Sequence, residues 1–454
     1  MESSERIIIC GAGIAGLATA YMLAKKHEYE NILLIDERAP MSLTSDKSTE
    51  CYRNWWPGPG DDMVKMMNRS IELIEEIAVE SGNVFHLNRR GYLYCVTDSA
   101  NINPLIDFAN EASDLGAGEI RTHQSIESDY IPAEPEGFEH IALGADLFLD
   151  QDLIQQVFPY LSNDTVAVLH VRNAGWLSAQ QFGAYLLEQV KNSGGNFLSG
   201  KVVEILQKDG QVVGVKLANG ERIEGNIFIN AAGPMLKDLG DLIGVDIPVY
   251  NELHLKASIN DSLIAVDRDA PMVILAENQI LPWTDEEKEM LKEEEETKYL
   301  TDTLPSGAHL RPEGGMEASS LLLLWDVHDE KVEAVFPPEL DPMYPELALR
   351  GISTLVPGLK KYIEKMPKPF IDGGYYTKTQ ENRPLACPLE LKGAYVIGAM
   401  AGYGIMAAAG LAEIVAAHVA ESELPEYAPA FSLSRYQDEN YINLLEDWGD
   451  SWQL

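Results

Sequence analysis

The sequence contains no apolar stretch long enough to span a membrane, so we expect no membrane span. The first strand-like run begins at Arg6, which leaves too little room for a secretory signal, so we expect none. Cysteine is equally scarce. The four cysteines lie far apart and form no CxxC pair, which argues against a disulfide framework and against a metal site: Cys10, Cys51, Cys95 and Cys387. These absences predict a cytoplasmic protein with reduced thiols and no metal.

Positively charged residues are also few. The chain has 34 lysines and arginines against 72 aspartates and glutamates, which gives a net charge of −38. A surface this acidic repels nucleic acid and anionic lipid, so we expect neither as a partner. It mildly favours the approach of cationic small molecules, but a requirement for solubility explains the same charge. The charge therefore excludes partners without naming a substrate.

The start of the chain has the pattern of a dinucleotide-binding site. A strand-like run at 6–10 is followed by Gly11-Ala12-Gly13-Ile14-Ala15-Gly16, a helical pattern at 17–26, and a second apolar run ending in Asp36-Glu37. In such a motif Gly11 permits the tight turn, Gly13 lets the backbone approach a pyrophosphate, and Gly16 lets the helix pack on the strand. The helix N-terminus offers N–H groups to phosphates, and the acid accepts hydrogen bonds from a ribose. We therefore predict an adenine-dinucleotide site.

A second strand, glycine turn and helix lie near the other end of the chain, at 394–398, 401–404 and 405–417. No acid-bearing strand follows, so this is not a second dinucleotide fold. A helix N-terminus at this point suits an electron-rich ring such as a flavin, where negative charge builds up on reduction.

The sequence between these motifs alternates helical and strand patterns. We predict helices at 61–81, 178–191 and 346–356, and strands at 91–96, 202–206, 212–217, 227–230 and 250–260. The irregular segment 41–60 carries unusually large side chains, and such loops often line a site. A charged helix is predicted over 284–300, with Thr284 and Glu287 as a capping box. It is either a lid or partner surface, or simply a solvated insertion.

Together these motifs resemble the D-amino-acid oxidase/sarcosine oxidase superfamily of FAD-dependent amine oxidoreductases. The matching motifs lie at 11–17, 34–37, the loop up to Arg53, 176–178, 230–233, 376–379 and 402–406. The resemblance implies an α/β fold, with a Rossmann-like FAD domain interleaved with an α+β substrate domain built on an antiparallel sheet. It assigns 1–82, 165–247 and 367–425 to the FAD domain, 83–164 and 248–366 to the substrate domain, and 426–454 to a C-terminal tail.

The resemblance also implies non-covalent FAD and a set of residues that bind it. Asp36 and Glu37 would hold the adenosine ribose, and the backbone of Val203 would contact the adenine. Gly404 and its neighbours would lie at the pyrimidine end of the flavin ring. The implied FAD-binding residues are Gly11, Gly13, Ile14, Ala15, Gly16, Asp36, Glu37, Thr44, Ser45, Val203, Ala232, Gly233, Gly402, Gly404, Ile405 and Met406.

Two departures from the family pattern bear on the chemistry. Met406 stands where sarcosine oxidases have a lysine linked to oxygen activation. Reoxidation by O₂ is therefore expected to be slow, unless Lys47, Lys378 or Arg53 supplies the charge, and the electron acceptor is O₂ or another molecule. Tyr375 stands where monomeric sarcosine oxidases attach the flavin to a cysteine, which predicts a releasable flavin.

The predicted reaction is oxidation of the C–N bond of a small amine or amino acid, secondary and N-methyl forms included, by hydride transfer to flavin N5. An amino acid needs an arginine for its carboxylate, and Arg53, Arg311 and Arg383 are candidates, with Arg311 favoured as a structural ion pair. The predicted catalytic residues are Tyr403, Arg53 and Met406. The predicted substrate-binding residues are Arg53, Trp55, Trp56, Arg383 and His254.

Two other functions fit the same pattern. One is an FAD-dependent dehydrogenase of 2-hydroxy acids, since the same geometry accepts C–O donors. The other is a non-catalytic flavoprotein that serves as an assembly or scaffold partner, with the charged insertion as its docking surface. A purely NAD-binding protein is disfavoured by the glycine turn at 401–404.

Overall fold

The predicted dinucleotide motif forms the centre of a mainly parallel sheet in the computed structural model, which describes residues 6–139, 142–327 and 330–446. Within these residues the sheet has six strands in the order β22-β23-β13-β1-β2-β9, and only β22 runs antiparallel to its neighbour. The strands are β1 (Ile7–Cys10), β2 (Ile32–Asp36), β9 (Asn196–Ser199), β13 (Ile227–Asn230), β22 (Leu385–Pro388) and β23 (Ala394–Gly398).

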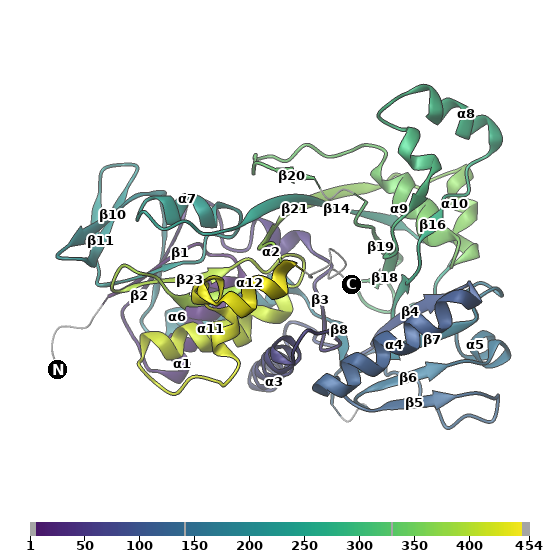
Figure 1. The fold of residues 1–454 in the computed structure, drawn as a ribbon, viewed down its shortest axis with the longest axis horizontal. Helices are drawn as coiled ribbons and strands as arrows, with labels where there is room; N and C mark the ends of the chain where they lie inside the picture. The colour runs from purple at the N-terminus through teal and green to yellow at the C-terminus, as the bar shows by residue number, and fades with distance from the viewer. Residues whose placement is uncertain (1–5, 140–141, 328–329, 447–454) are drawn as a thin grey trace.

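Helices cover one face of this sheet and a small meander covers the other (Figure 1). The helices pack against one another and are α1 (Ile14–Lys26), α3 (Asp62–Ser81), α6 (Ala179–Asn192) and α11 (Gly404–Val419). The meander consists of β10 (Val202–Lys208), β11 (Gln211–Leu217) and β12 (Arg222–Glu224), followed by α7 (Leu236–Asp241). Helix α3 ends at Gly82 in the left-handed conformation, as its sequence predicts.

A second, larger sheet of ten strands within the described ranges lies beside the first (Figure 1). Its order is β20-β14-β19-β18-β15-β4-β7-β6-β5, with β21 also paired to β14. The strands are β4 (Tyr92–Val96), β5 (Ile120–His123), β6 (Ala145–Phe148), β7 (Ala167–Val171), β14 (Tyr250–Asn260), β15 (Met272–Leu275), β18 (His309–Glu313), β19 (Ser320–Leu324), β20 (Lys331–Val332) and β21 (Phe370–Lys378). Most pairs are antiparallel, as predicted, but β4 with β15 and β5 with β6 are parallel.

The two faces of the larger sheet differ in chemistry. One face is apolar and is buried in a core with α5 (Gln151–Val157), α9 (Tyr344–Ser353) and α10 (Lys360–Glu364). On the other, register places Lys256, Leu324, His309, Ile274 and Tyr94 in one row across neighbouring strands. Side chains of such a row share a face of the sheet. This polar and aromatic face is turned toward the FAD-binding part, since Ile274 and Tyr94 belong to the same core as the helices of that part.

The remaining elements are short. They are α2 (Thr44–Lys47), β3 (Cys51–Arg53), β8 (Ala174–Trp176), α4 (Ile102–Ala112), β16 (Gln279–Ile280), α8 (Asp285–Glu293), β17 (Thr303–Leu304) and α12 (Glu439–Glu446). Strands β7 and β21 fall in ranges assigned from the sequence to the FAD domain, yet they pair within the larger sheet. The proposed domain boundaries stay a prediction.

The helix predicted over 284–300 is shorter than expected. Its capping box is present, since Thr284 Oγ1 accepts from the Glu287 N–H (3.2 Å) and the Glu287 carboxylate accepts from the Thr284 N–H (2.7 Å). Helix α8 nevertheless ends at Glu293, where the acid run begins. Consecutive negative charges at a helix C-terminus repel one another and the negative end of the helix dipole, which accounts for the early end.

Candidate functional site

A cavity of about 410 Å³ lies at the carboxyl ends of β1, β2 and β13, between the loop at 39–48 and the turn at 398–405. Nearly all its walls come from segments that the sequence singled out. Of the predicted FAD-binding residues, all line this cavity except Gly16 and Met406. That each of them contacts FAD stays a prediction, but the chain brings them together around one space.

The three positions of the first turn are occupied by glycine for different structural reasons. A Cβ on Gly11, whose φ is +110°, would lie 2.2 Å from the Ala231 carbonyl oxygen, and one on Gly16 would lie 2.0 Å from the Gly11 carbonyl oxygen. Both positions are therefore closed by the protein itself. A Cβ on Gly13 would meet only Ser45 Oγ, at 3.1 Å, so nothing else in the described structure demands glycine there. The space beside Gly13 opens into the cavity, which is what a bound pyrophosphate requires.

Hydrogen bonds hold this turn in place. The two Asp36 carboxylate oxygens accept from the backbone N–H groups of Ala12 and Arg38, each at 2.9 Å. Ser45 Oγ accepts from the Ile14 N–H at the start of α1 (3.0 Å). A carboxylate oxygen has capacity for a second hydrogen bond, so Asp36 can still accept from a ribose hydroxyl. The turn is pre-organised for an adenine dinucleotide.

Several lining residues were not among the predicted FAD-binding residues. Tyr375 and Thr377 both reach the cavity from β21, because alternate side chains of a strand point to the same face. That alternation was visible in the sequence once the strand was placed. Others, such as Cys10 and Met400, carried no signal of their own, because their position depends on how distant segments meet.

Arg53 lies beyond the turn at 398–405, in a buried aromatic cluster. Its guanidinium carbon is 4.5 Å from the centre of the Trp56 ring and 6.0 Å from that of Tyr92, and its Nε donates to the Trp55 carbonyl (3.2 Å). Its backbone N–H donates to Met406 Sδ (3.4 Å). Only 5% of Arg53 is exposed, and no carboxylate of the described residues forms an ion pair with it. A buried cation without an acid is a prepared site for an anion.

Two polar groups close to Arg53 are also buried without a hydrogen-bond partner in the described structure, the Tyr94 hydroxyl and Trp55 Nε1. Tyr94 lies beside Tyr92, with ring centres 6.4 Å apart. Groups of this kind are costly to bury, and a polar ligand would satisfy them.

The other two candidate arginines are already paired. The Arg311 guanidinium contacts Glu313 and lies 3.7 Å from Glu50, and its Nε donates to the Thr49 carbonyl (2.9 Å). Arg383 forms an ion pair with Asp62 (3.2 Å) and donates to a backbone carbonyl. The expectation of a structural ion pair for Arg311 agrees with its contacts.

Tyr403 connects the Arg53 cluster to the cavity. It precedes Gly404, its ring packs edge-on against Trp56 (5.0 Å), and its hydroxyl donates to the Asn382 carbonyl (2.6 Å). With this bond made, the hydroxyl keeps one acceptor position for a ligand.

His254 lies in a network of buried charges. Its ring stacks on Tyr376 at 4.0 Å, Nδ1 bonds Asp326 (2.7 Å) and Nε2 bonds Glu252 (3.0 Å), which also pairs with Lys378 (3.0 Å). Burial alone would lower the pKa of His254, but the two carboxylates outweigh it and raise the pKa to about 9. Both ring nitrogens are occupied, so direct contact with a substrate would require one of these bonds to break.

This network predicts a pH dependence of stability. A pKa raised from 6.5 to about 9 means that protonated His254 stabilises the folded chain fully below about pH 6.5, and that this contribution is lost as the pH rises through 9. We expect the unfolding temperature of the wild type to fall across this window more than that of His254→Gln. Parallel melting curves over the same pH range check this, and equal slopes for the two proteins would contradict it.

Comparison with known proteins agrees with this geometry. Residues 6–418 match the family model described as DAO, FAD dependent oxidoreductase. The chain belongs to this family. It is therefore an FAD-dependent oxidoreductase, and its cofactor is FAD. No curated protein sequence matches the chain, and among the described residues no helix is long and apolar enough to cross a membrane.

Solved structures of the same fold resemble this DAO-family chain over nearly its whole length. L-proline dehydrogenase from P. horikoshii is 18% identical, with a TM-score of 0.71 over 96% of this chain and 99% of that chain. Glycine oxidase from Geobacillus kaustophilus is 16% identical (TM-score 0.70, 95% and 98% covered). Iminodiacetate oxidase from Chelativorans sp. BNC1 is 15% identical (TM-score 0.70, 94% and 98% covered).

We expect the FAD of this family member to be released by acid precipitation. Tyr375, at the position of the cysteine in covalent relatives, lines the cavity, and its hydroxyl bonds the backbone N–H (2.9 Å) and carbonyl (2.7 Å) of Val335. It offers no thiolate for a bond to the flavin. Absorbance of the supernatant after acid treatment measures the release. Yellow colour that stays in the pellet would contradict the prediction and direct attention to Cys10, which lines the cavity, and to Cys51.

Proposed function

We propose that the protein oxidises the C–N bond of a small amino acid, with secondary and N-methyl amines as the wider substrate class. The observation that carries this proposal is the Arg53 guanidinium, which is buried among aromatic rings without a carboxylate partner in the described residues. A planar guanidinium suits a carboxylate through two parallel hydrogen bonds. The related structures support the same class, because they are named for proline, glycine and iminodiacetate.

When bound, FAD supplies the hydride acceptor at N5. The residues of this chain then have to hold the substrate carbon close to it and keep water away. In the proposed arrangement Arg53 binds the carboxylate, Trp56 and Tyr92 wall the pocket, and Tyr403 accepts a hydrogen bond near the amine. No acid–base triad is needed, since a neutral amine loses its hydride without prior proton transfer at the carbon.

The experiment is an anaerobic screen of flavin bleaching. The holoenzyme is mixed with D- and L-amino acids, N-methyl amino acids, amines without a carboxylate, and 2-hydroxy acids. Fast bleaching by an amino acid and slow bleaching by the matched amine supports the proposal. Preferred bleaching by a 2-hydroxy acid would favour the dehydrogenase alternative, and a flavin that none of these compounds bleaches would favour a scaffold protein.

We propose an electron acceptor other than O₂ as the faster partner. Lys47 is neutralised by Asp372 (2.8 Å) and Asp46 (3.0 Å), as Lys378 is by Glu252, so neither supplies a free positive charge. Lys256 differs from these two lysines because its bonds go to uncharged carbonyl groups, and we propose that it supplies a positive charge near the flavin. Its Nζ donates to the carbonyls of Asp46 (3.0 Å) and Ser48 (3.1 Å), on the loop that lines the cavity, and burial lowers its pKa.

A unit charge about 4 Å from an oxygen that gains negative charge is worth about 4 kcal/mol at an effective dielectric near 20, and about 1.4 kcal/mol is a factor of ten in rate. We therefore expect the reduced wild type to reoxidise more slowly in air than with an artificial dye. Lys256→Met should be slower still by about tenfold or more, and Met406→Lys faster. Stopped-flow reoxidation measures all three. This account would be refuted if the reduced wild type reoxidised in air as fast as a good oxidase does and Lys256→Met reoxidised at the same rate. Lys47 would then be the next residue to mutate.

We also propose a cytoplasmic location. The four cysteines are free and buried, which suits a reducing compartment. Fractionation of the source cells tests this.

A further inference from the structure

The chain continues beyond the family match, which ends at residue 418. Residues 427–441, here called the C-terminal clamp, fold back over the loop between β21 and β22. Tyr427, Ala428 and Phe431 join the main core, and the Leu433 N–H donates to Cys387 Sγ on β22 (3.4 Å). This segment is therefore packed into the FAD-binding part and is not a loose tail.

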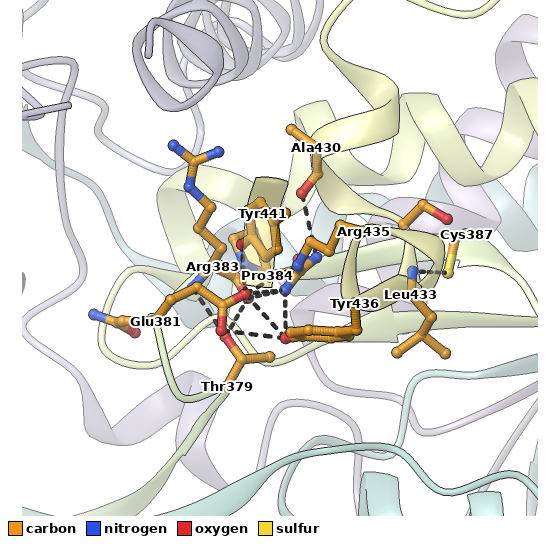
Figure 2. Close-up of polar contacts among 12 residues, drawn as sticks. Thr379, Glu381, Arg383, Pro384, Cys387, Ala430, Leu433, Arg435, Tyr436 and Tyr441 are labelled. Carbon is orange, nitrogen blue, oxygen red and sulfur yellow. Dashed lines mark hydrogen bonds and ion pairs between the residues drawn. The ribbon is translucent and has the colours of Figure 1, made fainter. Parts of the chain in front are cut away.

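Three side chains of the clamp bind one buried carboxylate. Arg435 bonds Glu381 through Nε (2.9 Å) and Nη2 (2.7 Å), and the hydroxyls of Tyr436 (2.9 Å) and Tyr441 (2.8 Å) donate to the same group. Figure 2 shows the three side chains of the clamp converging on Glu381, while Arg383 points away. The Glu381 side chain is 0% exposed, and Arg435 is 6% exposed. An ion pair that is buried and fully hydrogen-bonded holds its two segments in one geometry, and removing one partner is costly.

The loop that carries Glu381 also contacts a residue next to the cavity, Tyr403. The next residue, Asn382, offers its carbonyl to the Tyr403 hydroxyl (2.6 Å). Tyr403 lies between Gly402 and Gly404, which both line the cavity, and it is the N-cap residue of α11. Further along, Arg435 donates to the carbonyls of Pro384 (3.0 Å) and Arg383 (3.1 Å). A continuous set of contacts therefore runs from the clamp to the flavin end of the cavity.

We propose that the C-terminal clamp positions the glycine turn at the flavin end of the cavity, acting through Glu381 and Tyr403. Arg435 is then a positioning residue for the cofactor. Among the described residues Arg435 does not line the cavity, and its one hydrogen bond to a predicted substrate-binding residue is to the backbone carbonyl of Arg383. The inference rests on FAD binding by this family and not on the proposed substrate, so either can fail without the other.

The test measures FAD affinity on apoprotein, by quenching of flavin fluorescence. Arg435→Met should raise the FAD dissociation constant about tenfold, and Tyr436→Phe/Tyr441→Phe, which keeps the ion pair, about threefold. The matched control is Arg350→Met. Arg350 is a buried arginine (4% exposed) paired with Glu287 and Glu346 on the far side of the larger sheet, so its loss should lower the unfolding temperature and leave the FAD affinity unchanged.

A double-mutant cycle with Tyr403→Phe tests the route of the effect. If the clamp acts through Tyr403, the combined Arg435→Met/Tyr403→Phe protein should bind FAD about as weakly as the weaker single variant, instead of showing the product of the two losses. Arg435→Lys, which keeps the charge, should restore part of the affinity. Equal FAD affinity in wild type, Arg435→Met and the double-tyrosine variant, or an equal loss in Arg435→Met and Arg350→Met, would overturn the proposal.

Discussion

Gly13→Val is expected to yield a folded, colourless protein. The Cβ position at Gly13 meets only Ser45 Oγ, at 3.1 Å, so the chain can accept a side chain there with a small shift of one serine. The valine side chain would then occupy the wall of the cavity at the point where the backbone has to approach the pyrophosphate. We expect FAD affinity to fall by about 100-fold or more, which corresponds to about 2.7 kcal/mol.

Absorbance of the purified protein and titration with FAD measure this loss, and circular dichroism checks the fold. Gly315→Val is a suitable control, because a Cβ at Gly315 meets nothing within 4 Å and the residue lies outside the cavity. It should keep its full complement of flavin. A Gly13→Val protein that also keeps its flavin would show that the cofactor does not pass over this turn.

Arg53→Met is expected to cause the largest loss of activity. Removing one partner of a buried, hydrogen-bonded charge pair costs about 2–5 kcal/mol, which is between one and four orders of magnitude in kcat/KM for an amino acid. The matched amine, which has no carboxylate, should lose little, because it never used the guanidinium. Arg53→Lys should recover only part of the activity, since a lysine keeps the charge without the planar fork.

Arg311→Met provides the control for a general effect of losing a buried arginine. Arg311 is even more buried than Arg53, but it is paired with Glu313 and Glu50, so its replacement should lower stability and leave the preference for amino acid over amine in place. If Arg53→Met keeps that preference too, the carboxylate binds elsewhere.

Local patterns in the sequence were sufficient to place the first glycine turn and Asp36 at one cavity. Gly11, Gly13 and Asp36 lie within one short segment whose backbone geometry is set by neighbouring residues, so their arrangement around the cavity could be predicted. Two strands of the larger sheet, at 91–96 and 250–260, were also predicted, although its two parallel pairs were not. Parallel pairing joins strands far apart in the chain, and periodicity alone carries no information about such partners.

The substrate side could not be predicted in the same way. The sequence offered three arginines without saying which one lacks an acid, because the pairing acids come from distant segments: Asp62 lies over 300 residues from Arg383. The contacts of Lys256 were missed for the same reason, since it bonds a loop more than 200 residues away. The docking of Arg435 on Glu381 likewise depends on the fold of a segment that carries no family motif.

The most direct test of the account is the stoichiometry of one anaerobic turnover with the best amino acid from the bleaching screen. Oxidation of the C–N bond forms an imine, which water hydrolyses to one carbonyl group and one amine group; these leave as two products, or stay in one molecule when the substrate is a cyclic secondary amine. We predict one new carbonyl group and one new or freed amine group for each FAD reduced. Reduction of the flavin without formation of a carbonyl group, or with no cleaved or hydrolysable C–N bond in the product, would contradict the proposed reaction.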